Sequence, residues 1–95
     1  MDKLEKAQKA ARKRLSDNLK SFRAEHRISQ EELSERAGFH RTYVSQLERQ
    51  TINPTLDTVV AIAVALEVEL TDLLSERDGP PMTLKLGRRP SRKST

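Results

Sequence analysis

The sequence predicts an all-α protein with five helices, a basic helical extension before the folded body and a basic tail after it. Apolar residues recur at steps of three and four through most of residues 4–75, which is the spacing of one face of an α-helix. Capping residues, glycine and proline divide this stretch into segments of helical length. Strand-like alternation occurs only in residues 82–86, too short to form a sheet by itself. We therefore expect one small helical domain.

Length and composition set narrow limits on the class of protein. Ninety-five residues, 35% of them hydrophobic and 34% charged, allow one small core and exclude a multi-domain enzyme. The lack of cysteine excludes disulfides, thiolate zinc sites and cysteine nucleophiles, and is typical of a reducing compartment. His26 and His40 have no third ligand in prospect, so we expect no metal and no cofactor. The longest apolar run, residues 59–66, is too short to span a membrane and no secretory signal is present, so we expect a cytoplasmic protein.

Charge is distributed unevenly along the chain. Residues 1–14 carry six basic and two acidic side chains, net +4, and residues 85–95 carry five basic side chains and no acid. Residues 15–84 are mildly acidic, with seven basic and twelve acidic side chains. We expect a basic helical extension at 1–14, a folded domain at 15–77 and a basic tail at 78–95. The cationic ends either bind a polyanion or only keep the chain soluble.

The first helix is predicted from apolar spacing alone. Residues 4–22 place six apolar side chains at helical spacing without Gly or Pro, which indicates one long helix or two abutting ones. Large apolar residues come on successive turns only from Leu15. We therefore expect residues 15–25 to belong to the core and the part before Leu15 to fray.

The second helix is predicted from its capping signals. Ser29 and Glu32 form an S-x-x-E capping box, in which each side chain satisfies a free backbone N–H group, so the helix begins at Gln30. Gly38 tolerates positive φ and is typical of the position just past a helix end. This helix is therefore about eight residues long.

A third helix is expected at residues 41–49, after a short turn. Val44 and Leu47 lie three residues apart and are expected to face the core. Four polar residues fall within about 100° of one another on the opposite side of the helix, namely Thr42, Ser45, Gln46 and Arg49. This polar stripe is free to contact a partner.

Two further helices complete the predicted domain. Thr55 is expected to cap an apolar helix at Leu56–Leu66, with Asp57 placed favourably for the helix dipole. A short fifth helix is expected at residues 70–75. The segment Asp78-Gly79-Pro80-Pro81 then ends regular structure, because proline cannot continue the helical hydrogen bonds.

Two short helices joined by a tight glycine turn, with a polar stripe on the second, are the parts of a helix-turn-helix, whose second helix enters the DNA major groove. Over about residues 19–74 the chain closely resembles the Cro and phage-repressor family, often called the XRE family, in three segments: Ser29-Gln30-x-x-Leu33, Ala37-Gly38-Phe39-His40-Arg41-Thr42-Tyr43-Val44-Ser45-Gln46-Leu47-Glu48-Arg49 and Asn53-Pro54-Thr55-Leu56. The resemblance implies a compact five-helix bundle, the lambda-repressor-like DNA-binding domain.

The resemblance also implies which side chains contact DNA. Arg41, Thr42, Ser45 and Gln46 match positions that face the DNA bases. By side-chain chemistry, Arg41 suits guanine, Gln46 suits adenine and the Thr42 methyl group suits thymine. Phosphate contacts, which position the protein without selecting sequence, are assigned to Gln30, His40, Tyr43, Arg49 and Asn53, with Ser45 as a further candidate. Gln30 is also expected to brace the third helix.

Each of these assignments has an alternative that needs no DNA. The polar side chains of the third helix are then an ordinary solvated face. His40 is a turn residue or a weak helix cap, and Tyr43 belongs to the core beside Val44 and Leu47. The two sets of assignments differ in where these side chains point.

Two further expectations come from matching the chain to this family. Arg23 and Glu48 match a pair that forms an internal salt bridge between the first and third helices. Glycines of the family pattern, each just after a helix, are here replaced by Arg27, Gln50 and Glu67. Either these residues keep positive φ at a cost of roughly 1 kcal/mol each, or their loops adopt other turns.

Val60 and Val64 lie beside the inward row of the fourth helix, where relatives often carry polar residues. They indicate a homodimer interface, and the alternatives are a wider core or packing against the N-terminal extension. A two-fold dimer presents two third helices about one DNA turn, roughly 34 Å, apart and recognises a pseudo-palindromic site.

We therefore predict a sequence-specific transcriptional regulator that binds double-stranded DNA as a dimer. A repressor, a restriction-modification controller protein and an antitoxin remain open as variants, and a protein-interaction module with the same fold is the alternative class. No nucleophile-base pair, catalytic carboxylate pair or Gly-rich phosphate loop indicates an enzyme. No small-molecule ligand is expected, because nothing after Ser75 can build a pocket. The tail at 85–93 either adds phosphate contacts or acts as a spacer.

Overall fold

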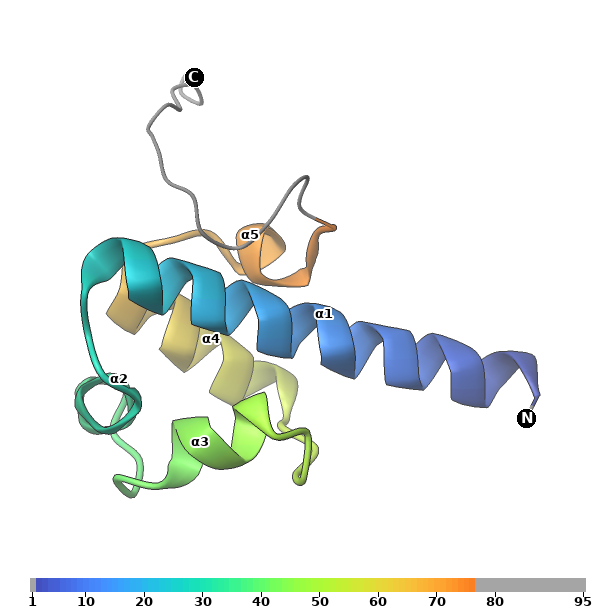
Figure 1. Ribbon diagram of the computed structural model, residues 1–95, viewed down its shortest axis with the longest axis horizontal. Helices are drawn as coiled ribbons and strands as arrows, with labels where there is room; N and C mark the ends of the chain where they lie inside the picture. Colours follow the sequence, from blue (N-terminus) through green and yellow to red (C-terminus); the bar gives the residue numbers. More distant parts are fainter. Residues whose placement is uncertain (1, 77–95) are drawn as a thin grey trace, which may run out of the picture.

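Five helices make up most of residues 2–76, the part of the chain that the structure, a computed structural model, describes (Figure 1). They are α1 (Lys3–His26), α2 (Gln30–Arg36), α3 (Tyr43–Glu48), α4 (Leu56–Leu66) and α5 (Leu70–Leu74). These residues contain no strand, and the all-α prediction is confirmed. The predicted tail at 78–95 lies outside the described residues. Among the described helices, none combines the length and apolar character needed to cross a membrane.

The core is formed by side chains from all five helices. Six apolar side chains are at most 1% exposed: Leu19, Leu33, Val44, Ile62, Leu66 and Leu73. Burial of each such side chain contributes roughly 1.5–3 kcal/mol. In Figure 1, α1 packs against α3 and α5, and α2 packs against α3 and α4. Val44 and Leu47 of α3 are buried as predicted, and so is the row of α4 expected to face inward, namely Val59, Ala63 and Leu66.

Helix α1 is one continuous helix, and the residues before Leu15, where fraying is expected from the sequence, are helical in the structure. Its N-terminus is closed by a capping box that the sequence analysis overlooked: the Asp2 carboxylate accepts a hydrogen bond from the Glu5 N–H at 2.8 Å, and the Glu5 carboxylate accepts one from the Asp2 N–H at 3.4 Å. The first buried residue is Leu15. The N-terminal half, residues 3–14, projects beyond the bundle (Figure 1). This projecting half is helical although it packs against little else.

The predicted bounds of the other helices differ from the observed ones by at most two residues, and the differences at α2 and α3 have local causes. Helix α3 begins at Tyr43 rather than at residue 41, because the Tyr43 N–H donates to the His40 carbonyl at 2.9 Å and closes a turn. Half of the predicted capping box of α2 is present, since Ser29 Oγ accepts from the Glu32 N–H at 2.9 Å. The Glu32 carboxylate pairs with Arg36 instead of returning to the Ser29 N–H. Helix α5 ends at Leu74, one residue early.

A buried asparagine that the sequence analysis did not identify joins the two ends of the domain. Asn18 is 3% exposed, and its side-chain amide donates to the carbonyls of Leu73 and Ser75 at 2.8 Å each. The Leu73 carbonyl lies in the last turn of α5 and the Ser75 carbonyl directly follows the helix, so neither has a helical partner. The sequence signal was an amide on the apolar face of α1, between Leu15 and Leu19. Asn18 therefore acts as the C-terminal cap of α5.

The three residues that replace family glycines all keep the left-handed backbone. Arg27, Gln50 and Glu67 have φ of 58°, 62° and 61°, and Gly38 has φ of 90°. Arg27 and Glu67 end α1 and α4 in this conformation, where their N–H groups satisfy the last helical carbonyls. A side chain there crowds the following carbonyl, so each of the three residues stores strain. The sequence left open whether these residues keep positive φ or their loops adopt other turns, and the structure shows that all three keep positive φ.

We expect Gln50→Gly to raise the free energy of unfolding by about 1 kcal/mol, because the relief of left-handed strain outweighs the greater entropy that glycine loses on folding. In this small domain that gain raises the melting temperature by roughly 4–8 °C. Arg49→Gly is the control, because the neighbouring residue has φ of −83° and has no such strain to lose. Thermal unfolding followed by circular dichroism should show a higher melting temperature for Gln50→Gly and a lower one for Arg49→Gly. Equal destabilisation of the two variants would contradict the presence of strain at Gln50.

Candidate nucleic-acid interface

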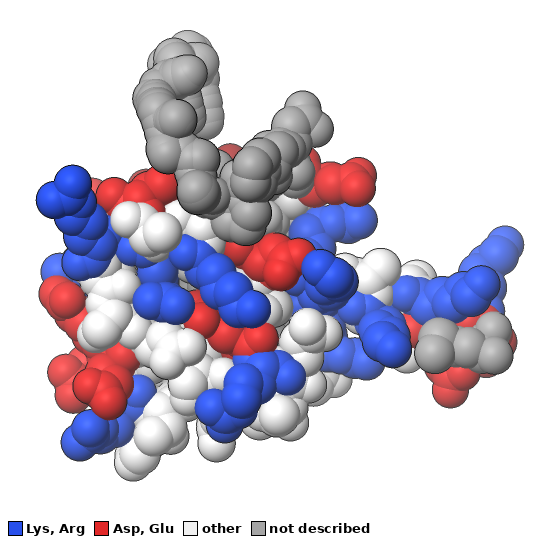
Figure 2. Space-filling view, in the orientation of Figure 1, with Lys and Arg blue, Asp and Glu red and all other residues white. Residues whose placement is uncertain are grey.

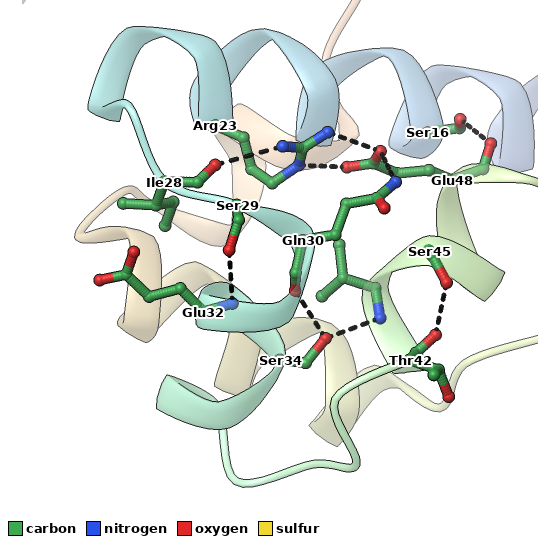
Figure 3. A network of polar contacts seen from close by, with 11 residues as sticks. Ser16, Arg23, Ile28, Ser29, Gln30, Glu32, Ser34, Thr42, Ser45 and Glu48 are labelled. Atoms are coloured by element: carbon green, nitrogen blue, oxygen red, sulfur yellow. Dashed lines mark hydrogen bonds and ion pairs between the residues drawn. The ribbon is translucent and has the colours of Figure 1, made fainter.

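A buried serine fixes the crossing of α2 and α3. Ser34 is fully buried, and its hydroxyl donates to the Gln30 carbonyl at 2.8 Å while accepting from the Val44 N–H at 2.9 Å (Figure 3). The Val44 N–H lies in the first turn of α3, where helical N–H groups lack partners. A small side chain is needed for the two helices to approach this closely. Ser34 therefore joins the start of α3 directly to α2.

A single carboxylate holds the other end of α3. The Glu48 side chain is 3% exposed and binds Arg23 in a two-point pair, from Nε to Oε2 at 2.7 Å and from Nη2 to Oε1 at 2.9 Å. Gln30 Nε2 donates to the same Oε1 at 2.8 Å, and Arg23 Nη1 donates to the Ile28 carbonyl at 3.2 Å (Figure 3). The Glu48 carbonyl accepts from Ser16 Oγ at 2.6 Å. Side chains from α1 and α2 thus orient α3 from one side.

The opposite side of α3 carries the polar stripe that the sequence predicted. Gln46 is half-buried, while Arg49 and Asn53 are exposed, and within residues 2–76 no hydrogen bond or ion pair engages their side chains. Ser45 is half-buried and its hydroxyl donates to the Thr42 carbonyl at 2.8 Å (Figure 3). The amide of Gln46 and the guanidinium of Arg49 are therefore available to an external partner. Ser45 is available chiefly as an acceptor.

Arg41 lies beside α2 rather than over α3. Its Nη2 atom is 3.0 Å from Glu31 Oε2, and the two side chains are 63% and 60% exposed. An exposed pair of this kind contributes about 0–1 kcal/mol, so the guanidinium can leave Glu31 for a stronger acceptor at little cost. The pair with Glu31 is therefore an internal contact of Arg41 that the sequence analysis did not predict.

His40 and Tyr43 both make internal contacts at the start of α3. His40 Nδ1 accepts from the Thr42 N–H at 3.2 Å and lies 2.9 Å from Thr42 Oγ1, so the imidazole caps the turn before α3. Tyr43 is half-buried against the core, with its ring stacked on Phe39 at 4.7 Å between centroids. Both residues therefore shape the start of α3.

Over residues 2–76, no group of three His, Cys, Asp or Glu side chains is placed to hold a metal ion.

Comparison with known proteins identifies the fold. A helix-turn-helix family model matches residues 19–73, which include α2, α3 and α4. The chain belongs to this helix-turn-helix family. It is similar to the control protein C.SmaI of Serratia marcescens, at 40% identity over 63 residues that cover 66% of this chain and 75% of that protein.

Two solved structures share the helix-turn-helix arrangement. The hypothetical transcription factor NHTF from Neisseria matches with a TM-score of 0.67 and 40% identity, over 68% of this chain and 75% of that one. The restriction-modification controller protein C.AhdI from Aeromonas hydrophila matches with a TM-score of 0.63 and 31% identity, over 67% of this chain and 93% of that one. The chain is thus a DNA-binding transcriptional regulator of the helix-turn-helix class and not an enzyme.

In a helix-turn-helix protein, the second helix of the motif is the recognition helix. Here that helix is α3, which is held by Ser34 at its start and by Glu48 at its end. The charge around it is not uniformly positive: acidic side chains gather over α2, whereas Lys and Arg line the projecting half of α1 (Figure 2). Glu31, Glu32 and Glu35 of α2 are all exposed. The positive charge of this helix-turn-helix domain therefore lies largely outside the motif.

Proposed function

We propose that this regulator recognises a specific, pseudo-palindromic DNA site with α3 and acts by occupying that site as a dimer. The observation that carries the proposal is the contrast between the two sides of α3. One side is fixed by the buried Glu48 pair, and the other presents Gln46 and Arg49 without partners among the described residues. A rigid helix with unengaged amide and guanidinium groups is what recognition of base edges and phosphates requires.

The proposed base contacts follow from side-chain chemistry. Gln46 forms two hydrogen bonds with adenine N6 and N7, and the Thr42 methyl group contacts thymine. Arg41 leaves Glu31 and binds guanine O6 and N7, while Ser45 accepts from a base or contacts a phosphate. Each good two-point contact contributes about 1–3 kcal/mol of discrimination against a wrong base.

The proposed phosphate contacts surround these base contacts. Arg49 and Asn53 extend from the end of α3 and the following loop, and both are exposed. Gln30 keeps a second amide hydrogen after donating to Glu48, which suits a phosphate at the start of α2. The remaining candidates are the Tyr43 hydroxyl and the His40 ring. We place this DNA-binding domain at residues 15–77.

The proposed dimer interface lies on α4. Three apolar side chains spaced four residues apart form a stripe on its outer face: Leu56, Val60 and Val64, which are 64%, 39% and 70% exposed. Successive members of this stripe are rotated by only about 40° on the helix, so they lie along one line. A second copy of the chain, related by a two-fold axis, would cover the stripe with the same stripe.

We expect Val64→Lys to weaken dimerisation about 100-fold, because a two-fold interface loses a buried valine from each protomer, roughly 3 kcal/mol in total. Leu4→Lys is the matched control: it adds the same charge at an apolar residue that is 65% exposed but lies on the projecting half of α1. Sedimentation equilibrium should show a shift to monomer for the first variant and no shift for the second. A wild-type protein that is already monomeric at micromolar concentration would contradict the interface.

Selection of the purified full chain on random duplex DNA at about 150 mM salt, where exposed charges are substantially screened, tests the proposal as a whole. Enrichment of an inverted repeat with half-sites about ten base pairs apart is the expected result. Binding without enrichment, lost as salt rises, would mean that the basic side chains hold DNA without selecting sequence.

A more specific role is favoured by the similarity to the control protein C.SmaI and to the controller protein C.AhdI. In that role the chain regulates transcription within a restriction-modification system. The genes beside its own decide this role: a methyltransferase gene and an endonuclease gene are expected there, and their absence would leave the general regulator.

A further inference from the structure

The projecting half of α1 carries most of the lysine and arginine side chains that form no ion pair within residues 2–76. Residues 2–14 hold six basic and two acidic side chains, and residues 2–11 are all exposed. The two acids, Asp2 and Glu5, are used in the capping box at the tip. Lys13 pairs with Asp17 at 2.7 Å, whereas within residues 2–76 neither Lys9 nor Arg12 forms an ion pair.

The rotation of α1 is set by its contacts with α3. Ser16 and Arg23 both reach Glu48, so their side of α1 faces the C-terminal end of α3. Lys9, Ser16 and Arg23 are spaced seven residues apart, which rotates each by only about 20° from the next on an α-helix. Arg12 lies four residues before Ser16, about 40° away. Lys9 and Arg12 are therefore on the side of α1 that faces α3.

The same geometry places these two side chains beyond the end of α3. Arg12 and Lys9 lie about 6 Å and 10 Å along the α1 axis from Ser16, at 1.5 Å per residue. In Figure 1 the projecting half of α1 continues past the C-terminal end of α3. Packed helices are about 8–10 Å apart, and the major groove is about 8.5 Å deep. With α3 in the groove, the phosphates at its rim therefore come to about the level of α1.

We propose that the projecting half of α1 is a second DNA-binding element, in which Lys9 and Arg12 bind backbone phosphates beyond the base pairs that α3 covers. The inference rests on the proposed insertion of α3 into the major groove. The element is already helical without DNA, so Lys9 and Arg12 are held one turn apart on one face before binding. It recognises the phosphate backbone of a duplex rather than any base, and adds affinity without adding sequence selection.

The test compares two charge-matched double variants of the full chain. Lys9→Gln with Arg12→Gln removes one lysine and one arginine from the side facing α3, and Lys3→Gln with Arg14→Gln removes the same pair of residue types from the opposite side. Glutamine keeps a good helix propensity, and far-ultraviolet circular dichroism checks that both variants retain α1. Binding to the duplex obtained by selection is measured between 50 and 200 mM salt.

Loss of two phosphate contacts lowers the slope of log affinity against log salt by about 1.8 per protomer, or about 3.6 for the dimer, so the wild-type affinity falls about 150-fold more than that of the Lys9 and Arg12 variant over this range. The Lys3 and Arg14 variant should keep the wild-type slope. Ethylation interference should show the first variant alone losing sensitivity at phosphates outside the α3 site. Equal slopes for the two variants would overturn the inference while leaving sequence recognition by α3 intact. A wild-type chain that selects no sequence would instead overturn the proposed function, and this inference with it.

Discussion

Replacing Glu48 with alanine is expected to lower the free energy of unfolding by about 3 kcal/mol, the cost typical of breaking a buried ion pair. The Glu48 carboxylate is almost completely buried and receives three hydrogen bonds, two from Arg23 and one from Gln30. Its removal leaves the Arg23 guanidinium, 20% exposed, without its charged partner. A buried donor without an acceptor loses its hydration and gains nothing in return.

This loss corresponds to a drop of roughly 12–24 °C in melting temperature for a domain of this size. Glu32→Ala is the control, since it breaks the exposed Glu32–Arg36 pair on α2 and should cost no more than about 0.5 kcal/mol. Denaturation with urea gives both free energies under the same conditions. A shift in melting temperature of under two degrees for Glu48→Ala would contradict the structural role of the pair.

Replacing Gln46 with alanine is expected to weaken binding to the selected DNA site by about 1–3 kcal/mol for each half-site, or roughly 5–150-fold per half-site. The Gln46 amide forms no hydrogen bond within residues 2–76, so its truncation breaks no internal polar contact and should leave the free energy of unfolding within about 0.5 kcal/mol of wild type. The loss should be confined to DNA that carries the recognised base. Binding to a duplex already mutated at that base pair should not weaken further.

Arg49→Ala is the comparison for a phosphate contact. It should weaken binding to matched and mismatched duplexes alike and lower the salt slope by about one. Fluorescence anisotropy on a panel of duplexes, each changed at one base pair, separates the two patterns. If Gln46→Ala weakened binding to all duplexes equally, its role would be a phosphate contact instead.

The helix positions could be predicted from the sequence wherever a local signal marks them. The bounds of α4 agree to the residue, because Thr55 caps its start and an unbroken apolar run follows. The start of α3 could not be placed, because the His40 ring binds the Thr42 N–H and holds a turn where helical periodicity continues. The point at which α1 begins could not be placed from apolar spacing, which carries no information about a capping box formed by Asp2 and Glu5.

In the candidate interface, too, some features follow from local sequence signals and others depend on contacts made in the folded chain. The outward stripe on α3 follows from 100° per residue, since Val44 and Leu47 must face the core. The contact between Arg41 and Glu31 depends on how the turn places two exposed side chains, which no spacing rule specifies. Asn18 was missed because its partners, the carbonyls of α5, lie more than 50 residues away in the chain.

The three-way contact of Glu48 also bears on how fast the regulator binds. Because Arg23, Gln30 and Ser16 hold α3 within the folded domain, the recognition helix is ordered before it meets a ligand. Preorganisation of this kind removes an entropic cost from the binding step. Encounter then resembles the docking of two rigid bodies, whose rate is set by diffusion and orientation rather than by a preceding conformational change. A loosened Glu48 contact would therefore slow association, even in a variant that remains folded.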